Sequence, residues 1–323
     1  MKLQYIRITT LYTTACILIT GLLFTTGCRK EKAPEPSNLD KNYFVVEDNP
    51  NDPVDHAIFE FYKSTGIPGY CSDTIYKEKV SRENEHPVRY KYITLSLSYT
   101  PLGTSYLNTM PLTSREGIPA LLNLLKTEVI PKLPPVRLFP AILFLDSFSA
   151  YLNTNVQISQ GWTALMGFNS LGVVAKDVEV MSTAERKIYA ASILAGIGEK
   201  RINDLMATRV LKEFLSISRE ATKDMLPNDL DIYIGWPFML FMPPGWEPPP
   251  QDLGFLFYPQ ISVYGMLVNN TLMQTDDIRG YLTAVFCYTN EEFAALHANE
   301  TLVLKKFGIM RNFAKEAGFK IPE

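Results

Sequence analysis

The spacing of apolar residues predicts helices in several parts of the chain. In 51–68, apolar residues recur at helical spacing after Asp52, a residue type that often caps helices. The clearest helix is 182–205, where Ser182 and Glu185 have the spacing of a capping box. The same criterion predicts further helices at 116–133, 207–226, 275–289, 290–299 and 300–321.

Two glycines lie in the middle of the 182–205 helix. Gly196 and Gly198 each lower the helical stability of this segment, because glycine loses more backbone entropy than other residues. We therefore expect that a neighbouring element packs closely against the helix at these positions.

Alternating and continuous apolar runs predict three strands. In 88–100, Ile93, Leu95, Leu97 and Tyr99 point to one side, which predicts a half-buried strand. The segment 140–151 opens with an apolar run typical of a central strand, and 170–181 is predicted as another strand. This order of elements predicts an α+β domain whose helices gather toward the C-terminal half.

The segment 236–259 has a different character. It combines seven prolines with a high density of aromatic residues. Proline removes a backbone donor and fixes φ, so no regular element tolerates so many of them. We expect an irregular segment here.

Residues 1–27 have the order of a secretory signal. Two basic residues come first, an uncharged and mostly apolar run occupies 8–24, and the small residues Thr26 and Gly27 precede Cys28. A run of about 17 residues is at the lower limit for crossing a bilayer. An uncleaved membrane anchor is therefore the alternative interpretation.

The sequence Thr-Thr-Gly-Cys resembles the bacterial lipobox, in which the cysteine receives diacylglycerol before cleavage. This resemblance implies that 1–27 is a lipoprotein signal peptide and that Cys28 is the lipid attachment residue, so that the protein is held on a membrane by a lipid anchor. Residues 28–40 are polar and charged, which predicts a flexible tether. Residues 41–323 remain as a single domain. Arg29 follows the cysteine instead of the Asp that holds many lipoproteins at the inner membrane, which favours the outer membrane of the cell envelope.

Composition limits the partners of the chain. Apolar residues make up 46% and charged residues 20%, which is typical of a globular protein. The formal charge is −3, and removal of residues 1–27 takes away two basic residues and no acidic one, which leaves −5. The sequence contains no run of five basic residues, so we expect no nucleic-acid partner. Of the cysteines outside the signal and the anchor, Cys71 and Cys287 are predicted to be free thiols, with a disulfide between them as the alternative.

Catalytic motifs are absent from the sequence. A zinc hydrolase needs clustered ligands, whereas His56, His86 and His297 are far apart, so neither a metal nor another cofactor is predicted. The Gly-x-Ser-x-Gly motif is missing, and Asp146 and Ser147 at a predicted strand end are favoured as turn residues.

Five residues are candidates for binding a ligand. Asp276 and Asp277 lie at a predicted helix start, where the helix dipole alone would favour acidic residues. Trp236, Trp246 and Tyr258 could form a stacking platform for a sugar or a protein side chain. The alternative is that these aromatic residues cover the core as an ordered loop.

Several stretches resemble a family of cell-envelope lipoproteins described as zinc-binding metallopeptidases, common in Bacteroidetes. They are DPVDHAIFEFYKSTGIPGY, LFPAILFLDSFSAYLNT, GFNSLGVVAKDVEVMSTAERKIYAASIL and the tail from DDIRGYLTAVFCYT onward. The resemblance implies a zincin (metallopeptidase)-like domain with a mixed sheet followed by a mostly helical C-terminal half. It also implies a His-Glu-x-x-His motif in the helix after 182, but residues 188–193 read IYAASI and contain neither His nor Glu. Asp276 or Asp277 would stand near the expected downstream acidic ligand.

We therefore expect a cell-envelope lipoprotein whose metallopeptidase-like domain lacks peptidase activity and acts as a binding or accessory protein. The resemblance implies a role beside glycan or nutrient uptake, with a glycan or a protein as ligand. Two alternatives remain open: a hydrolase that uses Asp146, Ser147, Asp276 or Asp277, and a purely structural envelope component.

Overall fold

The computed structural model describes residues 41–81, 86–97, 107–150, 160–227, 230–243, 245–263 and 265–323. The chain divides into residues 1–42 and a compact unit of residues 43–323, and the description below concerns the second unit. The predicted signal, the tether and Cys28 lie outside the described residues. None of the helices in the described ranges combines the length and the apolar character that crossing a bilayer requires.

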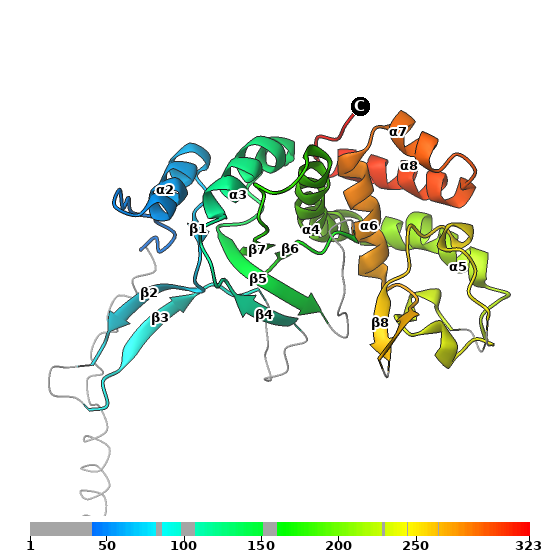
Figure 1. The fold of residues 1–323 in the computed structure, drawn as a ribbon, viewed down its shortest axis with the longest axis horizontal. Coiled ribbons are helices and arrows are strands. Elements are labelled where there is room, and N and C mark those ends of the chain that lie inside the picture. Colours follow the sequence, from blue (N-terminus) through cyan, green and yellow to red (C-terminus); the bar gives the residue numbers. More distant parts are fainter. Residues whose placement is uncertain are drawn as a thin grey trace, which may run out of the picture. The chain divides into compact units, whose positions relative to one another are not determined.

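The first half of this unit is mixed and the second half is mostly helical (Figure 1). The first half contains α2 (Pro53–Thr65), β1 (Gly69–Tyr70), β2 (Thr74–Lys79), β3 (Tyr90–Thr94), β4 (Leu107–Pro111), α3 (Ile118–Leu124), β5 (Ile142–Ala150), β6 (Ala164–Met166) and β7 (Leu171–Val174). The second half contains α4 (Thr183–Arg209), α5 (Ser216–Thr222), β8 (Gln260–Val263), β9 (Met266–Asn269), α6 (Gln274–Cys287), α7 (Asn290–Leu296) and α8 (Thr301–Glu316).

The main sheet has the order β1-β5-β7-β6, and β4 also pairs with β5. The pairs β1–β5 and β5–β7 are parallel, whereas β6 runs antiparallel to β7 and β4 runs antiparallel to β5. Two separate antiparallel hairpins, β2–β3 and β8–β9, complete the strands. The fold is thus mixed α and β, with a helical C-terminal half, as the order of the predicted elements indicates, and with a mixed sheet, as the resemblance implies.

The two faces of the sheet have different cores. Successive residues of β5 alternate between them, because side chains along a strand point to opposite faces. Ile142 and Phe144 belong to the main core beneath α2, α3 and α4, which Figure 1 shows on one side of the sheet. Leu143 and Leu145 form a smaller cluster with Leu95 on the other face. The helices therefore cover one face, and only a thin layer covers the other.

Helix α4 begins at the predicted residue. The hydroxyl of Ser182 accepts a hydrogen bond from the backbone N–H of Glu185, and the Glu185 carboxylate accepts one from the Ser182 N–H. The predicted capping box is therefore confirmed. The helix continues beyond the predicted end at 205, with a non-helical residue at Met206, and then passes through a π-helical turn (Val210–Leu215) into α5.

The close packing expected at the two glycines of α4 is confirmed at Gly196, whereas the contact at Gly198 is an ordinary van der Waals one. A Cβ atom built on Gly196 would lie 2.2 Å from the backbone oxygen of Ala164 in β6. A Cβ atom on Gly198 would meet Leu282 of α6 at 3.4 Å. Helix α4 therefore contacts the edge strand on one side and α6 on the other.

Helix α6 is the central element of the C-terminal half. It packs against α4 and α8, and its residues are buried from Asp276 to Cys287. The hydroxyl of Tyr281 donates to the carbonyl of Gly254, which attaches the 236–259 segment to the helix. Among its described residues, that segment contains short 3-10 turns and an isolated bridge at Pro237 but no longer helix or strand, as its prolines predict.

Two predicted strands end earlier than expected. Leu95 is buried and Leu97 packs against the same cluster, as the predicted alternation requires, but β3 stops at Thr94. Beyond it, the Ser96 carbonyl accepts hydrogen bonds from the backbone N–H groups of Phe168 and Asn169. Tyr99 lies outside the described residues. The prediction of a strand through 170–181 is wrong after Val174. Between Val174 and α4, the chain forms no strand. The guanidinium of Arg186 donates to the carbonyl of Val178, which holds the chain in a turn that leads into α4.

Candidate functional site

Asp277, one of the candidate ligand residues, is part of a closed ion pair. Its carboxylate lies 2.5 Å from the ammonium group of Lys306, and it accepts a hydrogen bond of 2.6 Å from the hydroxyl of Tyr233. Lys306 also donates to the hydroxyl of Ser218. Both charged side chains are at most 1% exposed, so this carboxylate has no access to solvent.

Aromatic rings surround the Lys306 ammonium group. The ring centroids of Phe214, Phe255 and Tyr281 lie 4.5, 4.9 and 5.0 Å from its nitrogen. Such rings attract a cation through their negative faces. Burial nevertheless lowers the pKa of Lys306 to about 8, and burial raises the pKa of Asp277 above its ordinary value. The arrangement joins α6 to α8 and is structural in character.

Asp276, the neighbouring candidate, caps its own helix. It accepts hydrogen bonds of 2.9 Å from the backbone N–H of Met273 and from the indole N–H of Trp162. Burial raises the pKa of this carboxyl. The guanidinium of Arg279 lies over the Trp162 ring at 4.1 Å from its centroid. Asp276 thus holds Trp162 in the space between the sheet and α6.

Arg279 closes the free side of the edge strand β6. Its guanidinium is buried and donates to the carbonyls of Ala164, at 3.0 Å, and Gly161, at 3.3 Å. The carbonyl of Thr163 points toward β7, where it accepts a hydrogen bond from the N–H of Val174. Successive carbonyls along a strand point in opposite directions, so the carbonyl of Ala164 points away from β7. An ion pair of 3.2 Å with Glu199 of α4 completes the arrangement. Backbone that could pair with a further strand is thus already occupied by an internal cation.

The three aromatic candidates separate into two groups. Trp246 and Tyr258 are partly buried against Phe238, with ring centroids 6.1 and 4.8 Å apart, and the Tyr258 hydroxyl donates to the carbonyl of Pro248. Trp236 is 49% exposed. The first two residues contribute to the loop that covers the core, and only Trp236 presents much of its ring to solvent. A ligand-binding role for these residues stays a prediction.

The three histidines are far from one another. His56 bonds Asp48, and His297 bonds Glu300 at 2.5 Å, while His86 is exposed. Within the ranges that the structure describes, no group of three or more His, Cys, Asp or Glu side chains is placed to hold a metal ion.

The two remaining cysteines are free thiols in different parts of the unit. Burial raises the pKa of both Cys71 and Cys287. A thiol acts as a nucleophile in its deprotonated form, so these environments oppose nucleophilic catalysis.

The residues proposed for an alternative hydrolase do not meet. Asp146 lies on β5, where its carboxylate accepts from the backbone N–H of Thr113 and lines a small surface pocket with Glu116 and Glu179. Hydrogen bonds from Thr113 lower its pKa. Asp277, by contrast, is enclosed between α6 and α8.

A pocket that the sequence did not reveal lies between α4, α6 and α7. Its volume is about 330 Å³, and we call it the helical pocket. It is lined by Ile188, Leu256, Phe257, Gly280, Thr283, Ala284, Cys287, Tyr288, Phe293 and His297. Gly280 makes one wall possible, since a Cβ atom there would lie 2.7 Å from the Phe257 ring. The pocket is mainly apolar and has a few polar groups at its edge, as ligand sites commonly do.

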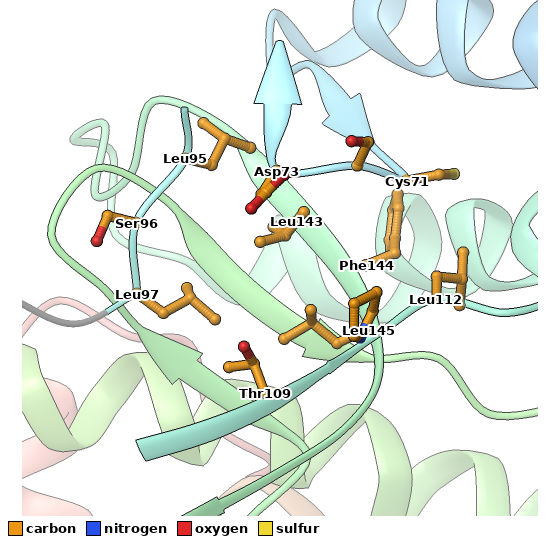
Figure 2. Close-up of a pocket in the computed structure, with 12 residues that line it drawn as sticks. Cys71, Asp73, Leu95, Ser96, Leu97, Thr109, Leu112, Leu143, Phe144 and Leu145 are labelled. Carbon is orange, nitrogen blue, oxygen red and sulfur yellow. The ribbon is translucent and has the colours of Figure 1, made fainter. Parts of the chain in front are cut away.

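A second pocket of about 440 Å³ lies on the thinly covered face of the sheet. Figure 2 shows Leu143 and Leu145 on its floor, the segment from Leu95 to Leu97 along one side, and Cys71 near Asp73 at the end where β1 leaves β5. Polar and apolar groups contribute about equally to its lining. It offers fewer apolar walls than the helical pocket.

Sequence reasoning could place the elements around the helical pocket but could not identify its lining. The 182–205 helix and the C-terminal helices were predicted, but which of their side chains meet around a pocket depends on how the helices pack. Comparison of the chain with protein-family models, curated proteins and solved structures gives no match.

Proposed function

We propose that the protein is a lipid-anchored protein of the bacterial cell envelope, at the outer membrane, whose zincin-like domain binds a partner and has no peptidase activity. Support for the zincin-like domain comes from the mixed sheet followed by the long helix α4, the helix in which the resemblance places the zinc ligands.

The main support for the lack of peptidase activity is the contact between α4 and β6. A His-Glu-x-x-His motif places its histidines four residues apart on one face of a helix. The resemblance places the motif at 188–193, where Ile188 and Ser192 have this spacing, and the Ser192 hydroxyl bonds that of Thr163 at 2.6 Å. One turn further along α4, Gly196 lies against β6. The backbone oxygen of Ala164 is 2.2 Å from where a Cβ atom of residue 196 would be. No imidazole fits at Gly196 unless β6 moves.

The fixed cation near this contact supports the same proposal. Arg279 donates to the Ala164 carbonyl and pairs with Glu199 of α4. A second positive charge placed beside this guanidinium in a region of low dielectric would be strongly disfavoured. The region between α4, β6 and α6 is thus filled by side chains.

The helical pocket is the binding site that we propose. Its walls are supplied largely by aliphatic and aromatic groups, and its polar edge includes Thr283 and His297. An apolar side chain of a partner peptide or protein fits this chemistry better than a sugar, whose hydroxyl groups need many hydrogen-bonding partners.

The test uses the full-length chain, purified in detergent, with arrays of peptides and of glycans. Binding of peptides with aromatic or branched aliphatic residues is expected. Ala284→Trp, which fills the pocket, should weaken this binding at least tenfold, whereas Ala294→Trp on the exposed face of α7 should not. Because a buried tryptophan can also disturb folding, Phe257→Ala, which removes a wall instead, provides a second variant.

Several results would contradict the proposal. Stoichiometric zinc after dialysis against zinc chloride, or cleavage of a peptide library, would show that the domain is a metallopeptidase or another hydrolase. Binding of glycans without binding of peptides would show that the ligand is a sugar and not a peptide or protein. An unmodified Cys28 found by mass spectrometry would exclude the lipid anchor.

A further inference from the structure

Two stretches of the C-terminal half are free of charged residues. One runs from 232 to 246, and the other runs from 253 to 275. Such long uncharged stretches are unusual for a chain in which a fifth of the residues are charged. Part of this apolar content is buried as core, but part of it is exposed.

The fold places the two stretches side by side. The backbone N–H of Thr271 donates to the carbonyl of Trp236 at 2.9 Å, and the Thr271 hydroxyl accepts from the Trp236 N–H at 3.0 Å. Pro237 and Asn270 form an isolated antiparallel bridge. The β8–β9 hairpin comes immediately before Asn270 in the sequence. Figure 1 shows it extending from the N-terminal end of α6, away from α7 and α8.

Five large apolar side chains on these stretches are exposed. Their exposed fractions are 49% for Trp236, 57% for Met239, 65% for Leu240, 59% for Met266 and 60% for Leu267. We call these five residues the uncharged face. The backbone bonds between Trp236 and Thr271 bring the two stretches together, whereas Met266 and Leu267, as consecutive residues of β9, point to opposite sides of the hairpin. Exposed apolar groups gathered on neighbouring stretches mark interaction sites more often than scattered ones do.

The chemistry of this face suits a lipid bilayer. Protein partners are commonly selected through charged and hydrogen-bonding groups at the rim, and the two stretches that carry the face supply no charge. Leu and Met side chains partition into the acyl region, and Trp prefers the boundary with the headgroups. The proposed anchor at Cys28 also keeps a bilayer near, since the residues between it and Tyr43 span at most about 50 Å.

We propose that the uncharged face rests in the surface of the bilayer that carries the lipid anchor, with Met239, Leu240, Met266 and Leu267 inserted among the acyl chains. This inference rests on the proposed function for the identity of the anchoring membrane. The lipid anchor then raises the effective concentration of the uncharged face at the membrane.

The test starts from the full-length lipidated chain in vesicles of phosphatidylethanolamine and phosphatidylglycerol. A protease site replaces part of the tether within 30–40, so that cleavage removes the anchor after reconstitution. The released unit of residues 43–323 has its own core. We expect it to stay on the vesicles, and 0.5 M salt should not remove it, because the five side chains of the uncharged face carry no charge and the nearby Glu247, which accepts from Asn269 of β9, would not attract anionic lipid.

Variants decide whether the uncharged face is responsible. Met266→Glu with Leu267→Glu should lower the retained fraction at least tenfold. Leu205→Glu, an exposed apolar position on α4, is the matched control and should leave it unchanged. Brominated lipids should quench the fluorescence of the cleaved protein, and Trp236→Phe should remove most of this quenching.

Complete release of the cleaved protein, or equal retention of the hairpin variant, would overturn the inference. So would a stable dimer that buries this face in solution. Mass spectrometry of the cleaved tether peptide reports separately on acylation of Cys28. Loss of the anchor and loss of the membrane contact are thus distinguished.

Discussion

The buried pair of Asp277 and Lys306 gives a direct test of how the C-terminal half is held together. Lys306→Met leaves the Asp277 carboxylate without its counter-ion, and Asp277→Leu leaves the ammonium group without its partner. Each single change should be strongly destabilising, because a buried charge without compensation is costly. Replacing both residues removes both charges and should cost much less than either change alone.

The expected magnitudes follow from the complete burial of the pair. Each single variant should lower the free energy of unfolding by about 3–5 kcal/mol, a large part of the about 5–15 kcal/mol available to a typical protein. The double variant leaves the hydroxyls of Tyr233 and Ser218 without charged partners, so we expect a loss of about 1–3 kcal/mol. Tyr233→Phe alone removes one hydrogen bond and should cost about 1 kcal/mol.

The assay is urea unfolding followed by circular dichroism at pH 7, analysed as a double-mutant cycle. The sign of the pH dependence is also fixed. Burial raises the pKa of Asp277 in the folded state, so its contribution to stability is present below its ordinary pKa and is lost as pH rises. The cost of Lys306→Met should therefore shrink as pH falls toward about 4. Additive losses in the cycle, or single variants within about 1 kcal/mol of the wild type, would refute this account.

Three other predictions test local features. Gly196→Ala should lower the free energy of unfolding by about 1–3 kcal/mol because a Cβ atom has no room there, whereas Gly308→Ala, with nothing within 4 Å, should raise it by up to about 1 kcal/mol in the same urea titration. Asp52→Ala should lower the thermal midpoint at pH 7, and this difference should vanish as pH falls through the pKa of Asp52, which the hydrogen bond from a backbone N–H of its own helix lowers. In the native protein, a thiol reagent should label the partly exposed Cys71 before the buried Cys287, and comparable labelling rates would contradict the buried position of the latter.

Local sequence signals predicted most of the helices because they act over one or two turns. Asp52 and Ser182 both cap helices where their side chains were expected to do so. The strand 170–181 was predicted too long, since Val178 and its neighbours continue the alternation but bond with Arg186 from the next helix. Hydrophobic periodicity cannot distinguish a strand from a turn whose carbonyls find side-chain partners.

The candidate residues show the same limit. Asp276 and Asp277 were recognised as acidic residues at a helix start, but their partners come from remote positions such as Trp162 and Lys306. The aromatic residues of 236–259 were recognised as a group, although only the packing around Phe238 distinguishes covered rings from the exposed Trp236.

By itself, the sequence determined the apolar faces, the helix caps and the absence of a His-Glu-x-x-His motif, since these depend on residue type and short spacing. Only the tertiary structure decided that Gly196 lies against the Ala164 carbonyl, that Arg279 occupies the free side of β6, and that two uncharged stretches lie side by side. Those facts depend on contacts between residues far apart along the chain. Such contacts are fixed when the whole core packs at once, and no local pattern records them.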